Sequence, residues 1–241
     1  MYNRSIYKFM KTALFILHQK TSEAGNIGNK LKKRGFTFDI VRPSLGEELP
    51  NNLNKYSAIV VFGGPMSVND QDEYMKKEIL WIGEVLKTNI PFLGICLGAQ
   101  LLAKYLGCKV ERNKEKLSEI GFYKIKPTSK GFEMFKSNDI FYQFHSEGFT
   151  INENCELLAK GDVFNNQAFK YQNCYALQFH PEVNIYLHLK WIFLVLIKKP
   201  HVLYQKGAQG IFNQLRFRIK YNSSISKWLD YFLDNYFLKK L

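Results

Sequence analysis

Short apolar runs alternate with amphipathic stretches along the first hundred residues. The segments between the runs carry apolar residues at helical spacing, as at Ile79, Ile82, Val85 and Leu86. This alternation predicts a mostly parallel sheet with crossover helices. The strands are expected at residues 13–17, 37–41, 58–62 and 90–95, and the helices at about 25–35, at 72–87 and from Cys96 to Gly107.

Beyond the third helix the pattern turns to four further β runs, which we expect to extend the same sheet as antiparallel strands. A stretch rich in Gly, Asn and Ser, residues 206–224, reads as a loop. From Ser224 onward, serine caps and an apolar face predict a terminal helix. The four runs are residues 120–125, 155–159, 167–171 and 175–179.

The longest apolar run, Trp191 to Ile197, lies between Lys190 and Lys198. It is far shorter than the roughly 20 residues that span a bilayer, so a buried helix is predicted and no membrane partner is expected. Attachment to a membrane surface is the minor alternative, because the flanks of the run are basic. The run at residues 13–17 is too short for a signal sequence and has no cleavage site after it.

The 241 residues are 46% hydrophobic and 23% charged, a composition that favours one globular domain over residues 1–241. The excess of 34 Lys and Arg over 21 Asp and Glu gives a charge of +13. Because the lysines are scattered, without an Arg-rich arm, specific nucleic-acid binding is not expected. The four cysteines show no metal-binding spacing, so we expect no metal and a reducing cytoplasmic location.

Candidate chemistry begins where the fourth predicted strand meets the third helix. The sequence Gly-Ile-Cys-Leu-Gly, residues 94–98, has the pattern of a nucleophile elbow with Cys96 at its tip. Such a turn holds the nucleophile in a strained conformation at the carboxyl edge of the sheet, and the N-terminus of the following helix favours a thiolate.

A base for this thiol is supplied by His180, which follows a β run. Pro181 favours an extended backbone, and residues two apart in an extended chain point the same way, so Glu182 can orient the His180 ring. The oxyanion of an acyl intermediate needs N–H donors. Leu97 offers one in the elbow, and Gly64 offers another in the loop after the third strand.

Together these motifs resemble the class I glutamine amidotransferases, and most closely stand-alone proteins similar to the amidotransferase domain of GMP synthase. The resemblance covers most of residues 12–185 and leaves a helical extension at about 186–241. It implies a flavodoxin-like α/β fold with helices on both faces of the sheet, no cofactor, and a substrate-binding role for Gln100. It is carried by Phe62-Gly-Gly-Pro-Met-Ser-Val, Leu93-Gly-Ile-Cys-Leu-Gly-Ala-Gln-Leu-Leu-Ala, Glu119-Ile-Gly and Gln178-Phe-His-Pro-Glu-Val.

The DJ-1 and PfpI group also uses a cysteine elbow, but there a histidine directly follows the nucleophile, where this chain has Leu97. Another departure concerns the loop Phe144–Phe149, which replaces a Trp-His-Gly-Asp-Thr-Phe-like loop of stand-alone relatives. By resemblance this loop helps to hold the substrate's α-amino and α-carboxylate groups, with His145 and Ser146 as the candidate contacts. A structural role is the alternative for His145, and the roles of Ser146 and Glu147 are left open. The apolar segment after Val183 is either a partner-docking surface or core.

The activity implied is hydrolysis of glutamine, or of a related γ-glutamyl bond, through a thioester on Cys96. Ammonia would pass to a separate synthetase acting in trans. The alternatives are a free-standing γ-glutamyl peptidase acting on glutathione-like compounds and a non-catalytic binding module.

Overall fold

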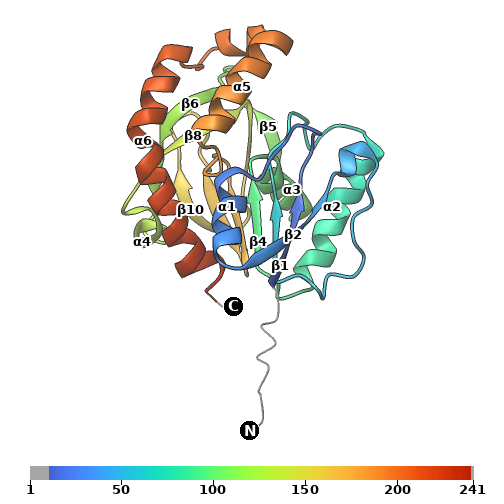
Figure 1. Cartoon of the computed structure of the whole chain (residues 1–241). Helices are drawn as coiled ribbons and strands as arrows, with labels where there is room; N and C mark the ends of the chain where they lie inside the picture. The colour runs from blue at the N-terminus through green and yellow to red at the C-terminus, as the bar shows by residue number, and fades with distance from the viewer. Residues whose placement is uncertain (1–10, 240–241) are drawn as a thin grey trace.

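A computed structural model of the chain describes residues 11–239, which form a twisted central sheet covered by helices (Figure 1). The first five strands in spatial order run parallel to one another, and the last three alternate in direction. The order is β2 (Phe36–Val41), β1 (Lys11–Ile16), β3 (Ala58–Val61), β4 (Phe92–Ile95), β12 (Cys174–Leu177), β11 (Ala168–Tyr171), β10 (Glu156–Lys160) and β7 (Lys126–Pro127).

Helices cover both faces of this sheet. Helices α1 (Gly25–Lys33) and α6 (Ile211–Phe232) pack on one face, and α2 (Glu73–Leu86) and α3 (Leu97–Tyr105) on the other, each over its own apolar cluster. This arrangement confirms the predicted class, a mostly parallel α/β sheet with helices on both sides. The remaining elements are η1 (Pro43–Leu45), β5 (Val110–Arg112), β6 (Glu119–Lys124), α4 (Phe132–Phe135), β8 (Ile140–His145), β9 (Glu147–Phe149), α5 (Ile185–Lys198), η2 (Pro200–Tyr204) and a π-helical turn, η3 (Leu233–Phe237).

Two of the four later strands differ from the expectation of antiparallel extension. Strand β12 pairs in parallel with β4, with Leu177 opposite Ile95, and only β10 and β11 extend the sheet antiparallel as predicted. Strand β6 leaves the sheet and pairs with β8 in a separate two-stranded sheet. The parallel pairing matters for the site, because it brings the carboxyl ends of β4 and β12 to the same edge.

The prediction of a loop at residues 206–224 is also wrong, because most of these residues belong to α6, which begins at Ile211. Polar residues on the inner face of α6, Gln214 and Arg218, are buried at helical spacing and hide the periodicity. Ser224 does not cap a new helix. It lies inside α6, and its hydroxyl donates to the Tyr221 carbonyl at 3.0 Å.

Helix α5 contains the long apolar run, which was predicted to be buried. Only part of it is: Ile192 is 8% exposed, whereas Phe193 and Ile197 are each 63% exposed. Within residues 11–239, no helix combines the length and apolarity needed to cross a bilayer. One side of α5 therefore packs on the body of the protein and the other faces outward.

Helices α5 and α6 meet around His188, which is fully buried. Arg218 Nε donates to His188 Nδ1 at 3.4 Å, and His188 Nε2 lies 3.3 Å from Gln214 Oε1. Burial, together with the charge of Arg218, lowers the pKa of His188 to about 4. The ring is therefore neutral in the folded protein.

Acidification should destabilise this junction. The unfolded chain takes up a proton at His188 near its ordinary pKa of 6.5, and the folded chain only near 4, so stability present above pH 6.5 is lost as the pH falls toward 4. Urea unfolding at pH 7.5 and pH 5 should show a loss of about 2 kcal/mol from this group. In a His188→Gln protein, the free energy of unfolding should lose this part of its dependence on pH. A pH dependence equal to the parent's would contradict the inference that His188 is neutral in the folded protein.

Candidate active site

The sharp turn between β4 and α3 holds Cys96 in a backbone conformation with φ 50° and ψ −103°, in the left-handed region that residues other than glycine rarely adopt. The Cys96 N–H donates to the Leu177 carbonyl of β12 at 2.8 Å, which fixes the turn to the neighbouring strand. A side chain at Gly98 would collide with the Val61 carbonyl. Close packing of α3 on β3 therefore requires glycine there, as the elbow pattern predicts.

The structure brings His180 and Glu182 to this turn. His180 Nδ1 lies 2.7 Å from Glu182 Oε1, and the two side chains are each 3% exposed. A Cβ atom placed on Gly63 would lie 2.8 Å from His180 Cε1 and 3.4 Å from Cys96 Cβ. The cysteine and the imidazole therefore face each other across Gly63, a glycine that sequence reasoning left without a role.

The charge state of His180 follows from these neighbours. Burial alone would lower the pKa of the ring, but the charges of Glu182 and Cys96, with the hydrogen bond to Glu182, raise it to about 10. The imidazole is thus protonated at neutral pH, and Glu182 stabilises the cation.

The two predicted oxyanion donors belong to adjacent segments. A Cβ on Gly64 would lie 2.9 Å from Leu97 Cδ2 and 2.8 Å from His18 Cβ, so the loop after β3 packs directly against the elbow. Behind this loop His18 is held by Glu78, with Nε2 3.0 and 3.2 Å from the two carboxylate oxygens. Both side chains are fully buried, which fixes the position of the loop.

Gln100 was predicted to bind substrate, and the structure shows its amide engaged inside the protein. Its Nε2 donates to the Glu147 carbonyl at 3.0 Å and to Gln178 Oε1 at 3.2 Å. Gln178 in turn donates from Nε2 to Cys96 Sγ at 3.6 Å. Gln178 directly follows the last residue of β12, at the edge of the sheet where the elbow lies, and sequence reasoning gave it no role.

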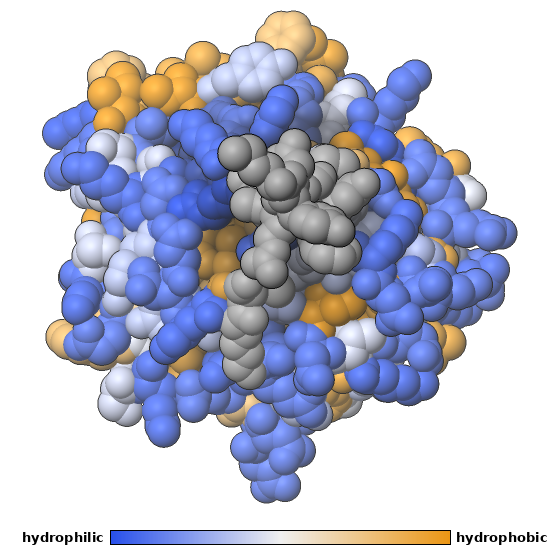
Figure 2. Space-filling model, turned by 60° about the horizontal axis from the view of Figure 1, so that its bottom comes forward, coloured by the Kyte–Doolittle hydropathy of each residue, from blue (hydrophilic) through white to orange (hydrophobic). Residues whose placement is uncertain are grey.

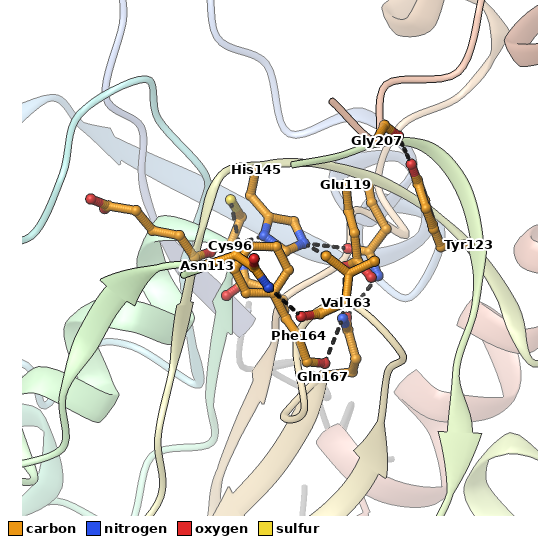
Figure 3. Close-up of polar contacts among 12 residues, drawn as sticks. Cys96, Asn113, Glu119, Tyr123, His145, Val163, Phe164, Gln167 and Gly207 are labelled. Atoms are coloured by element: carbon orange, nitrogen blue, oxygen red, sulfur yellow. Dashed lines mark hydrogen bonds and ion pairs between the residues drawn. The ribbon is translucent and has the colours of Figure 1, made fainter. Parts of the chain in front are cut away.

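Residues 144–149 pass close to the elbow, and His145 anchors them. Its Nε2 lies 3.0 Å from Glu119 Oε2 and its Nδ1 2.9 Å from the Glu147 carbonyl, while Gln167 also donates to Glu119 (Figure 3). His145 and Glu119 are buried, so His145 is held as an internal group. Ser146 is partly exposed beside it.

Glu147, whose role was left open by the sequence, joins two loops. Its Oε2 accepts a hydrogen bond from Ser67 Oγ at 2.8 Å. Its carbonyl meanwhile accepts from Gln100 and contacts the His145 ring. The altered loop is therefore tied both to the segment that follows Gly64 and to α3.

Trp191 of α5 is another residue near the site that sequence reasoning did not place. Its ring meets His180 edge to face with centroids 5.1 Å apart, and it packs on Phe144 at 5.9 Å. No local pattern relates it to the elbow, because the contact depends on how α5 docks.

Across residues 11–239 no group of three or more His, Cys, Asp or Glu side chains is placed to hold a metal ion.

Comparison with known proteins agrees with this geometry. The family model of glutamine amidotransferase class-I matches residues 19–198, and the chain belongs to this family. Among solved structures, a glutamine amidotransferase from Thermotoga maritima shares 29% identity with a TM-score of 0.83, covering 94% of this chain and 97% of that one.

Two curated relatives match this chain over very different shares of their own length. The putative glutamine amidotransferase-like protein YfeJ of Salmonella typhimurium is 30% identical over 182 residues, 71% of this chain and 75% of the relative. A glutamine-hydrolyzing GMP synthase of Staphylococcus saprophyticus is 28% identical over 159 residues, which is 65% of this chain but only 30% of that protein.

Proposed function

We propose that this protein hydrolyses the side-chain amide of glutamine to glutamate and ammonia, with Cys96 as nucleophile, His180 as acid and base, and Glu182 as the partner that orients His180. The observation that carries the proposal is the meeting of Cys96 and His180 at the ends of two neighbouring parallel strands, with Glu182 2.7 Å from the ring. We also propose that residues 1–241 act as one unit and that the protein works in the cytoplasm, where its free cysteines stay reduced.

The reaction begins with attack of the Cys96 sulfur on the amide carbon. The N–H groups of Gly64 and Leu97 stabilise the oxyanion that forms. His180 gives its proton to the nitrogen as the C–N bond breaks, which releases ammonia and leaves a γ-glutamyl thioester. Water then attacks this thioester, His180 accepts the water's proton, and the C–S bond breaks to give glutamate and free Cys96. Gln100, His145 and Ser146 would shape the pocket, His145 by holding the loop.

The test is to assay the purified protein with glutamine and with γ-glutamyl peptides, and to treat it with an electrophilic glutamine analogue. We expect ammonia release from glutamine and a single covalent adduct that peptide mass spectrometry locates on Cys96. Glutamine should protect Cys96 from labelling. Labelling at another cysteine, or none at all, would refute the proposed nucleophile.

A synthetase acting in trans is the partner that fits this reaction. The chain matches only 30% of the Staphylococcus GMP synthase, so most of that protein has no counterpart here. Ammonia made at Cys96 would therefore be used by a separate chain. Glutamine turnover that rises when such a synthetase is added would support this arrangement.

A γ-glutamyl peptidase is the second candidate. Its substrates carry the same γ-glutamyl group as glutamine and differ only in the leaving group, so the same triad would serve both, and the contacts of Glu147 with Ser67 and Gln100 do not separate the two substrates. Faster turnover of γ-glutamyl peptides than of glutamine, without any partner, would decide for the peptidase.

Gln178 is expected to position and stabilise the sulfur of Cys96 during turnover. Its donated hydrogen bond strengthens when the sulfur carries negative charge, and hydrogen bonds to charged groups contribute about 1.5–3 kcal/mol. A Gln178→Leu protein should lose about 10- to 100-fold in kcat. Its rate of alkylation by iodoacetamide should reach half-maximum at a higher pH.

Gln214→Leu provides the matched control, because Gln214 is an equally buried glutamine that lies between α5 and α6. It should lower the melting temperature without moving the pH profile of alkylation. If both variants shift that profile equally, the effect comes from loosened packing and Gln178 has no special role.

A further inference from the structure

Exposed bulky apolar side chains are concentrated in one part of the molecule. Among the described residues, fourteen large hydrophobic side chains are exposed, and nine of these lie between residues 185 and 219. We name this the apolar–basic surface, formed by the outer sides of α5, η2 and the first half of α6 (Figure 1). Its apolar members are Ile185, Tyr186, Leu189, Phe193, Leu196, Ile197, Tyr204, Phe212 and Ile219.

On α5 these residues form a continuous stripe. Ile185, Leu189 and Phe193 follow one another at intervals of four, and Leu196 and Ile197 continue the line, so they share one side of the helix. The opposite side carries Leu187, His188 and Ile192, which are buried. Apart from their backbone, the five stripe residues offer no hydrogen-bonding group.

The charged residues that this stretch of sequence itself contains are all of one sign. No Asp or Glu occurs in the sequence between Glu182 and Asp230, although the chain has 21 of them, and that stretch carries six lysines and two arginines. Lys190 pairs with Glu23 and Lys206 with Glu115. Within the part of the chain that the structure describes, the exposed cations without an ion pair here include Lys198, Lys199, Arg216 and Lys220.

This distribution differs from the rest of the molecule. The face shown in Figure 2 is mostly hydrophilic, with hydrophobic residues along the upper edge and in smaller patches near the middle. Single exposed apolar residues occur elsewhere, such as Leu80 on α2, but without a neighbouring stripe on the same helix. A contiguous apolar stripe flanked by cations marks a docking site.

We propose that the apolar–basic surface binds an anionic lipid surface, with the α5 stripe entering the boundary between head groups and acyl chains. A helix with an apolar side and flanking lysines lies in this plane, and each nearby cation adds attraction to anionic lipid. The stretch of sequence that forms this surface contains no Asp or Glu whose negative charge would repel anionic lipid.

Other occupants fit less well. Protein interfaces are enriched in arginine and depleted in lysine, whereas the exposed cations here are mainly lysines. A second copy of the chain would bring two faces of the same positive sign together, which is unfavourable. A lipid bilayer needs neither hydrogen-bond complementarity nor a shaped pocket, which matches a plain aliphatic and aromatic stripe.

The experiment is co-sedimentation of the full chain with phosphatidylcholine vesicles, with and without phosphatidylglycerol. We expect binding to the anionic vesicles, little binding to the neutral ones, and loss of binding as salt is raised. Phe193→Glu with Ile197→Glu should lower the partition coefficient at least about tenfold. Lys198→Glu with Lys199→Glu should lower binding to anionic vesicles specifically.

Leu80→Glu is the matched control, because Leu80 is 69% exposed but lies on α2, which packs on the other face of the sheet from α6. It should bind vesicles as the parent does. Equal binding of parent and double variant, or no binding by the parent, would overturn the proposal. Light scattering that shows a dimer in the parent and a monomer in the Phe193 and Ile197 variant would instead assign the surface to self-association and also overturn it.

Discussion

A Cys96→Ala protein is expected to lose glutamine hydrolysis by at least about 10⁴-fold, the loss typical of removing a covalent nucleophile. The remaining groups cannot replace it. His180 acts as acid and base in the proposed reaction but forms no thioester, so without the Cys96 sulfur the reaction has no covalent intermediate. Ammonia release should be followed with a coupled glutamate assay at saturating glutamine.

Cys155→Ala supplies the control for this experiment. Cys155 is a partly exposed free cysteine, and burial raises the pKa of its thiol, so it stays protonated and unreactive. This variant should keep the parental rate and the parental adduct on Cys96. A Cys96→Ala protein that retains the parental rate would show that the elbow is not the nucleophilic centre.

The local part of the site could be predicted because it depends on short-range rules. A turn of the type Gly-x-Cys-x-Gly between a strand and a helix fixes the position of Cys96. His180 and Glu182 also meet, as their closeness in sequence suggested, although a turn at Pro181 and Glu182 brings them together in place of the extended chain that was predicted. The first four strands were correct for the same reason. Each is a compact apolar run with its own boundaries.

What could not be predicted depends on tertiary packing. The run at β12 has the same apolar pattern in either direction, and only its pairing beside β4 brings His180 to Cys96. Helix α6 was hidden because Gln214 and Arg218, both polar, occupy inward positions: Gln214 lies within hydrogen-bond reach of His188, and Arg218 donates to the Val183 carbonyl at 2.7 Å. The exposure of α5 likewise depends on which neighbours cover it.

The hydrogen-bond network beside the elbow could be predicted only in part. Gln100 and His145, for which a substrate-binding role was predicted, both lie near the elbow, but their partners lie far away in sequence. Gln100 donates to Gln178, 78 residues away, and His145 contacts the buried carboxylate of Glu119. A single sequence gives the residue types of such a network, and only the fold shows that its hydrogen bonds run from Glu119 to Cys96.

The second large effect is expected from Glu182→Gln. In the parent, Glu182 Oε1 accepts a hydrogen bond from His180 Nδ1 at 2.7 Å, and the carboxylate stabilises the charged ring. A glutamine of the same shape removes that charge, and its amide can present an N–H to the ring, which favours the wrong tautomer. The rate should fall by up to about 10⁴-fold, the loss known for a triad carboxylate that becomes an amide.

The pH dependence separates this cause from simple unfolding. Because the charge of Glu182 helps to raise the pKa of His180, the variant's imidazole should lose its proton at a lower pH than the parent's. Imidazole NMR signals, followed from pH 5 to pH 10, would report the change directly, and Glu84→Gln, which alters an exposed carboxylate, should leave them unmoved. A Glu182→Gln protein with parental kcat and an unshifted His180 titration would show that this carboxylate only supports the fold, and that His180 is oriented by other contacts such as the Trp191 ring.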